Sequence, residues 1–272
     1  MDEEIEKNDL VQKIEVMKEE IDALQISFMK EKTPWYKNVS TLIAMLALIF
    51  SFGTTFISYL HIREQDIQNS KSELRSMLQR LTSLPKENFE IQKKFMDDPV
   101  GTGLLGGYIN QENTILSRQT LDLIKSLPQD RITAIEFFST AQALMNAYDI
   151  INALECYQKS VEVSNDFNTE LAARRGYANL LLYTRKLEEG RQQYESAINI
   201  FSRYKGYNRI IQIASNLETE LLWAQSEANN NFKDKARIHV EKASGYLKDL
   251  PENQLKEGLK RKINQVAENL GL

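Results

Sequence analysis

The segment that most constrains this chain is an uncharged run of 25 residues, 38–62, which reads NVSTLIAMLALIFSFGTTFISYLHI. At about 1.5 Å per residue, a helix of that length exceeds the roughly 30 Å hydrocarbon core of a bilayer. Trp35, Tyr36 and Tyr59 lie near its ends, where aromatic residues gather at membrane interfaces, and Arg63 follows it. The run therefore predicts an uncleaved transmembrane helix and a single-pass membrane protein.

Two other interpretations of this run are open. One is a buried helix of a soluble core, although apolar runs in such helices are usually shorter. The other is a cleaved signal peptide, but roughly 35 mostly polar residues precede the run, which is the wrong kind of N-terminal region. Lys30, Lys32 and Lys37 before the run outnumber Arg63 directly after it. The positive-inside rule then predicts a cytoplasmic N-terminus and a C-terminal domain outside, by a small margin because more basic residues follow.

Small residues recur along the run at helical steps of three or four, so that they form one stripe: Ser40, Ala44, Ala47, Ser51 and Thr55. Such a stripe lets two helix backbones approach closely in lipid. We expect transmembrane packing and self-association through it. The alternative is that small residues are simply common in membrane helices.

Apolar residues flank the run with the spacing of amphipathic helices. Before it, steps of four and three predict an amphipathic or coiled-coil helix over 1–33, with the seam Leu10, Ile14, Met17, Ile21, Leu24 and Phe28. This helix either pairs with a copy of itself or lies on another protein. After the run, an apolar residue recurs every seven positions from Leu60 to Leu81. This repeat predicts a stalk helix over 63–84 that ends before Pro85.

The stretch PVGTGLLGGY places Gly101, Gly103 and Gly106 at the G-x-G-x-x-G spacing of dinucleotide-binding loops. That motif needs a preceding strand and a surrounding βαβ unit. The segment before it is charged and lacks a β-branched run, and the segment after it has a helical period, so this context argues against nucleotide binding. We instead predict a flexible, glycine-containing linker over 85–110, followed by a helical domain over 111–272.

The composition indicates an all-α fold and argues against several kinds of chemistry. Glycine (11) and proline (5) are scarce among 272 residues. With Cys156 as the only cysteine and two histidines, the chain has few candidates for a metal centre or a Ser-His-Asp triad. The net charge of −4 gives no electrostatic reason to expect a nucleic-acid partner. We therefore predict no enzyme, no cofactor and no metal site.

A spacing of 12, 4 and 3 residues occurs three times in the C-terminal half. Mostly small or aromatic residues take these positions: Ala141, Ala153, Tyr157 and Ser160; Ala178, Gly190, Tyr194 and Ala197; Ala224, Ala236, Val240 and Ala243. Small residues at such points let the two helices of a pair interlock. The alternative is a plain helical bundle in which the spacing is a coincidence.

This pattern resembles the tetratricopeptide repeat (TPR), whose consensus has small residues at those points and an aromatic residue between the last two. The resemblance covers roughly residues 130–250. It departs from the family because the units are offset by 37 and 46 residues instead of about 34. In addition, Val240 replaces the aromatic residue, and Arg174 stands where the first unit has Phe137. The resemblance implies an α-solenoid of TPR-like helix pairs.

In that family, the first helices of the units line a concave face that binds proteins or peptides. The resemblance therefore implies a partner-binding groove formed by Phe138, Gln142, Met145, Arg175, Asn179 and Tyr183. We expect a scaffold or adaptor that is anchored in the lipid bilayer, binds a protein or peptide partner and can form a homo-oligomer. The alternatives are an accessory subunit of a membrane enzyme, transport or secretion complex, or a structural spacer.

Overall fold

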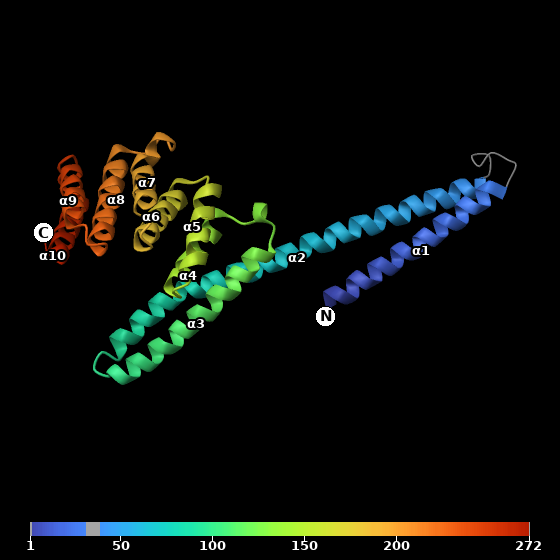
Figure 1. The fold of residues 1–272 in the computed structure, drawn as a ribbon, viewed down its shortest axis with the longest axis horizontal. Helices are drawn as coiled ribbons and strands as arrows, with labels where there is room; N and C mark the ends of the chain where they lie inside the picture. Colours follow the sequence, from blue (N-terminus) through green and yellow to red (C-terminus); the bar gives the residue numbers. More distant parts are fainter. Residues whose placement is uncertain (1, 31–38, 272) are drawn as a thin grey trace. The chain divides into compact units, whose positions relative to one another are not determined.

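A computed structural model describes residues 2–30 and 39–271, and every regular element in those ranges is a helix (Figure 1). The all-α prediction is confirmed. The helices are α1 (Asp2–Lys30), α2 (Val39–Lys94), α3 (Pro99–Ser126), α4 (Ala134–Asn146), α5 (Ile150–Val163), α6 (Phe167–Tyr183), α7 (Leu187–Ile198), α8 (Arg209–Asn229), α9 (Lys233–Lys248) and α10 (Gln254–Leu270), with 3₁₀ turns η2 (Gln129–Arg131) and η3 (Asn199–Ser202). The chain divides into two compact units, Met1–Ile67 and Gln68–Leu272.

The first part of α2 contains the uncharged run. Among the described residues, α2 is the one helix that is long and apolar enough to cross a membrane, judged by length and composition. Its most apolar stretch is not buried by the rest of the protein. The flanking residues Lys32, Trp35, Tyr36 and Lys37 lie outside the described ranges. The membrane crossing itself and its direction stay predictions.

In the first unit, α1 lies alongside the start of α2. Residues of both helices line a hollow between them, including Met17, Leu24, Ala44, Ala47 and Ser51. The apolar seam expected on α1 and the small-residue stripe expected on α2 therefore face each other here. The side chains of Leu10 and Phe28, at the two ends of that seam, lie outside the described part.

The stalk helix, expected to end before Pro85, instead continues as part of α2. Proline usually ends a helix because it has no N–H to bond to the carbonyl four residues earlier. Here the following turn is held from the side, because Arg80 pairs with Glu87 on α2 and donates from Nε to Oε1 of Glu112 on α3 (2.6 Å). The same hydrogen bonds hold the pKa of both carboxyl groups below their usual range.

The glycine stretch is helical, and the linker expected over 85–110 is mostly occupied by the end of α2 and the start of α3. Pro99 begins α3, and the carboxylate of Asp98 caps it by accepting a hydrogen bond from the N–H of Gly101 (2.9 Å). Farther along, side chains of α3 contact α2 through Arg80–Glu112 and Thr120–Met77. The helical region therefore begins before residue 111.

Three helix pairs follow, α4 with α5, α6 with α7 and α8 with α9, and α10 packs on the last pair (Figure 1). Every position of the 12-4-3 spacing is buried. The turn inside each pair is also the same, because Tyr148, Arg185 and Asn231 all have left-handed backbone conformations, with φ of 60°, 66° and 68°. Their offsets match those of the repeated spacing, so the regularity extends from the sequence to the backbone.

A buried ion pair joins the second helix pair to the third. The carboxylate of Glu227 on α8 is fully buried and accepts hydrogen bonds from Arg191 Nε on α7 (2.7 Å) and Trp223 Nε1 (3.1 Å). Burial opposes ionisation of this carboxyl group, but these bonds outweigh it, so its pKa lies below the usual range. Tyr194 of α7 stacks on Trp223 with ring centroids 5.4 Å apart, which adds a second contact between the two helices.

The long insertion between the second and third pairs folds back onto α6. The ring of Phe167 lies 4.3 Å from that of Tyr207, centroid to centroid. Next to it, the fully buried carboxylate of Glu170 accepts a hydrogen bond from the Tyr204 hydroxyl (2.9 Å) and pairs with Arg203. The insertion is therefore a packed part of the fold, and it fixes the point at which α8 begins.

We expect Gly190→Ala to lower the free energy of unfolding by about 1–3 kcal/mol, because α6 and α7 touch at this point. A Cβ there would meet the carbonyl oxygen of Ala178 at 3.0 Å and Leu182 closer still. Gly103→Ala is the matched control, since nothing lies within 4 Å of its added Cβ, and it should gain about 0.5–1 kcal/mol. Urea unfolding of the full chain in non-ionic detergent, followed by circular dichroism, measures both. A stable Gly190→Ala variant would contradict the close approach.

We expect Glu227→Gln to lower the free energy of unfolding by about 3–5 kcal/mol at pH 7, because Arg191 would lose its buried partner. Glu188→Gln is the control, since Glu188 pairs with the same arginine but is 81% exposed, and its effect should be far smaller. The pKa of the Glu227 carboxyl group is lower in the folded protein than in the unfolded chain, where it is near 4.3. Its stabilisation of the fold is therefore complete above the pKa of the unfolded chain and is lost as the pH falls through the pKa of the folded protein. The difference in unfolding free energy between the wild type and Glu227→Gln should therefore narrow below about pH 4. Equal effects of the two substitutions would refute this assignment.

Candidate partner-binding site

The six residues expected to bind a partner lie on two neighbouring helices. Three are on α4 (Phe138, Gln142 and Met145) and three are on α6 (Arg175, Asn179 and Tyr183). Because α4 contacts α6 and α6 contacts α8, the first helices of the three pairs follow one another in space. Gln142, Asn179 and Tyr183 are exposed, whereas the other three are half-buried.

Phe138 and Arg175 are largely used by the fold. The ring of Phe138 meets that of Tyr157 on α5 edge-on, with centroids 6.0 Å apart. Arg175 donates to the Ser215 carbonyl (2.7 Å) and, from Nη2, to the Thr219 hydroxyl (2.8 Å), both on α8. Burial also lowers the pKa of the Arg175 guanidinium below its ordinary value. Arg175 thus ties α6 to α8, and most of its donors are already engaged.

A groove of about 450 Å³ runs between the first turns of α6 and α8, beside Arg175. Its apolar lining includes Leu171 on α6, Ile211 on α8 and Leu255 on α10. Ile211 and Leu255 are 48% and 44% exposed, so apolar surface is open to solvent there. Glu218 adds a carboxylate to the lining. The arrangement suits an apolar side chain carried on a polar backbone.

Asn179 and Tyr183 line a separate, smaller hollow of about 130 Å³. Asn179 accepts a hydrogen bond from the Ser226 hydroxyl of α8 (2.9 Å), which in turn bonds Tyr194 (2.8 Å). Tyr183 is 65% exposed at the rim. The structure therefore places the α6 residues along the α6–α8 junction, but in two hollows.

The groove contains residues that the repeat spacing does not single out. Ile210, Ile211 and Ala214 precede the repeated positions of the third unit, because α8 begins early at Arg209. The signal for them in the sequence is the longer offset before the third unit, followed directly by an apolar stretch. Leu255 comes from α10, beyond the repeats, and no local pattern connects it to this groove.

Two other candidates for chemistry, Cys156 and His239, are buried. Cys156 is 3% exposed, and burial raises the pKa of its thiol to about 12, so it is a poor nucleophile and a poor reporter of topology. His239 is buried with its Nδ1 atom 2.6 Å from Glu220 Oε2. Within residues 2–30 and 39–271, no group of three histidine, cysteine, aspartate or glutamate side chains could hold a metal ion.

Comparison with protein families, curated proteins and solved structures finds no match for this chain. The likeness to tetratricopeptide repeats therefore stays a prediction, supported by the buried spacing and the repeated turns.

Proposed function

We propose that this protein is a membrane-anchored scaffold with a TPR-like helical domain that binds a protein or peptide partner. The observation that carries the proposal is the open apolar groove between α6 and α8. Exposed apolar surface that is rimmed by polar groups is typical of an interaction site. Within the described residues no cluster could hold a catalytic metal ion, and the groove is open to solvent, which favours binding over catalysis.

The groove favours an apolar side chain over a terminal carboxylate. Arg175 is the cationic side chain of the groove lining that a ligand carboxylate would meet. It is already bonded to Ser215 and Thr219 and lies 3.9 Å from Glu218. A ligand carboxylate would have to displace these bonds. An apolar side chain that fills the space between Leu171 and Ile211 displaces only water, which is favourable.

The proposed anchor requires α1 to leave the first part of α2. The described face of α1 carries many charges, including Glu15, Lys18, Glu19, Glu20 and Asp22. Carrying each of these into hydrocarbon costs about 2.5–3.5 kcal/mol on insertion scales. When α2 spans a bilayer, α1 therefore lies outside the hydrocarbon, and the stripe that contains Ala47 and Ser51 becomes free to pack against a second copy.

A photo-crosslinking residue placed at Ile211 should capture a discrete partner in membranes of cells that make the protein. Ile238 on α9 is the matched control, because it has the same side chain and is 50% exposed, against 48% for Ile211, but does not line the groove. We expect a much stronger crosslinked product from position 211 than from position 238, because only at position 211 would the reactive group lie against the bound partner. Identical products from both positions would count against a partner in this groove.

Replacing Ala47 and Ser51 together with isoleucine should weaken self-association in a membrane two-hybrid assay, because the larger side chains keep the helix backbones apart. The control pair is Ile43→Leu with Phe50→Leu, since these two residues are 60% and 73% exposed and lie off the stripe. An unchanged signal for the isoleucine pair would argue against dimerisation through this face.

A further inference from the structure

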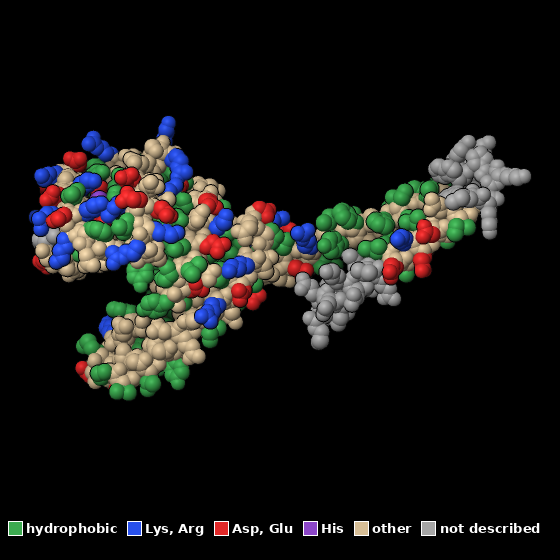
Figure 2. All heavy atoms as spheres, viewed as in Figure 1, with side chains coloured by type: hydrophobic (Ala, Val, Ile, Leu, Met, Phe, Trp, Pro, Cys, Tyr) green, Lys and Arg blue, Asp and Glu red, His purple; other side chains and the backbone are tan. Residues whose placement is uncertain are grey.

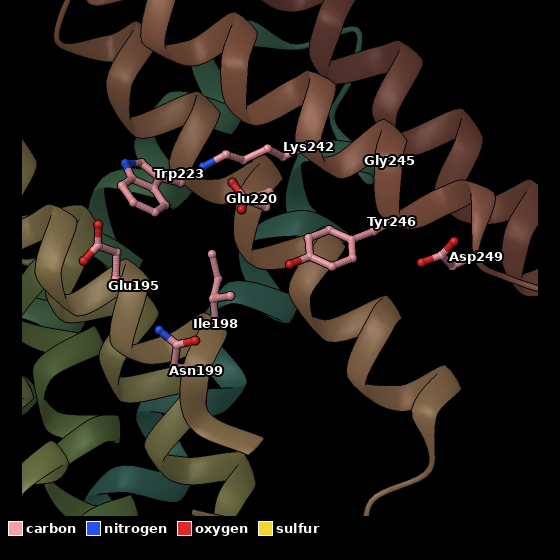
Figure 3. A pocket seen from close by; sticks show the side chains of 9 residues that line it. All are labelled: Glu195, Ile198, Asn199, Glu220, Trp223, Lys242, Gly245, Tyr246 and Asp249. Carbon is pink, nitrogen blue, oxygen red and sulfur yellow. The ribbon is translucent and has the colours of Figure 1, made fainter. Parts of the chain in front are cut away.

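A second hollow, of about 520 Å³, lies between α7 and α9, with α8 as its floor (Figure 3). It shares no residue with the groove between α6 and α8. Ile198 of α7 and Tyr246 of α9 give it apolar walls, and Trp223 of α8 lies at one end. The hollow is therefore a separate surface with its own chemistry.

Carboxylates from three helices line this hollow. Glu195 on α7 and Asp249 at the end of α9 are exposed at its rim, while Glu220 on α8 lies on its floor. Lys242 is the one cationic side chain among the residues that line it. The lining therefore carries a formal charge of −2, from three carboxylates and one ammonium group.

The floor carboxylate is half satisfied. Oε2 of Glu220 lies 2.6 Å from Nδ1 of His239, and the side chain of Glu220 is only 3% exposed. Among the described residues, no side chain or backbone group forms a hydrogen bond with its other oxygen, Oε1. That oxygen also keeps some exposed surface, since it is not among the fully enclosed polar atoms that lack a partner. Figure 3 shows the carboxylate pointing into the open space. A nearly buried anion thus presents one oxygen to whatever enters.

At the aromatic end of the hollow, the ring of Trp223 already stacks against two other rings, so a cation suits this end better than a further aromatic ring does. Trp223 is stacked on His239 with centroids 4.0 Å apart and on Tyr194 at 5.4 Å. Lys242 places its ammonium group 5.9 Å from the centre of the Trp223 ring. A cation of the chain itself therefore already uses this environment, which is the kind of contact that aromatic rings offer to cations.

We propose that this hollow binds a cationic side chain, lysine or arginine, presented by a partner segment. The alkyl stem would lie against Ile198 and Tyr246, and the charged end would meet Glu220 Oε1, the oxygen that His239 does not contact. Charge complementarity selects this ligand, because an anionic side chain would be repelled by three carboxylates and a neutral apolar one would leave Glu220 unpaired. This site is independent of the proposed groove between α6 and α8.

The test uses the full chain in non-ionic detergent with Trp35→Phe, which leaves Trp223 as the sole tryptophan and fluorescent reporter. The probes are the blocked tripeptides Gly-Arg-Gly, Gly-Lys-Gly and Gly-citrulline-Gly. Citrulline keeps the shape of arginine without its charge. We expect saturable binding of at least one cationic peptide, weakening with added salt, and no measurable binding of the citrulline peptide. Equal binding of the citrulline peptide, or no binding of either cationic peptide up to 10 mM, would overturn the proposal.

Three variants separate a binding site from a merely structural contact. Glu220→Gln should weaken cationic-peptide binding about tenfold or more, the size of one charge-assisted hydrogen bond, whereas Glu241→Gln, one residue before Lys242 and outside the lining, should leave it unchanged. Lys242→Met should strengthen binding severalfold, because a like charge in the lining is removed while an apolar side chain remains. An unchanged or lower affinity of Lys242→Met would contradict the proposed charge selection.

A Gly245→Met variant tests the same site even if Glu220→Gln fails to fold. Nothing lies within 4 Å of a Cβ at Gly245, and methionine favours a helix more than glycine does. This variant should keep or raise the unfolding free energy while its side chain fills the hollow. We expect it to weaken binding about tenfold or more. Unchanged affinity in a folded Gly245→Met protein would place the ligand elsewhere.

Discussion

The junction between the second and third helix pairs depends on the buried carboxylate of Glu227. Both of its oxygens are bonded, to Arg191 on the preceding helix and, at Oε1, also to Trp223 on its own helix. A buried carboxylate without such partners would cost several kcal/mol, so the contact is satisfied only when α7 and α8 meet in one orientation. The stack of Tyr194 on Trp223 and the hydrogen bond from Tyr194 to Ser226 strengthen the same junction. An ionic bond beside an aromatic stack thus sets how the third pair sits on the second.

The parts of the fold that could be predicted are those encoded within a short stretch of chain. The spacing of Ala178, Gly190 and Tyr194 predicts a close helix pair, and Gly190 is indeed the point where a Cβ would strike the neighbouring helix. A 12-residue step is enough to reveal this, because both helices lie in one continuous segment. The uncharged run shows itself for the same reason, since its apolar side chains are contiguous. Helix content and helix pairing can therefore be predicted from the sequence without knowledge of distant contacts.

The parts that could not be predicted depend on partners far away in the chain. Pro85 and the glycines after it are local signals for a break, yet Arg80 reaches Glu112 across the α2–α3 hairpin and the helices continue. Apolar side chains of both helices, such as Phe89, Leu104 and Tyr108, remain exposed on this hairpin, and Figure 2 shows apolar surface there. Arg175, which the repeat resemblance places in a partner-binding groove, does line the groove between α6 and α8, but its bonds to Ser215 and Thr219, 40 and 44 residues later, follow from no local pattern. Helix propensity describes a single residue, whereas these outcomes depend on contacts between residues that lie far apart in the chain.

Helix α8 lines both proposed binding sites, the groove between α6 and α8 and the hollow between α7 and α9, so its rigidity matters to each. Arg175 fixes its first half from α6, Arg191 fixes its last turns from α7, and His239 holds Glu220 from α9. Bonds from three helices leave α8 little freedom to rotate, and a ligand in either hollow would meet a surface that is already shaped. Preorganisation of this kind reduces the ordering cost of association. Under the two proposals made above, a helix held on three sides would not relay a ligand-driven rotation from one face to the other, so the two proposed sites would bind independently.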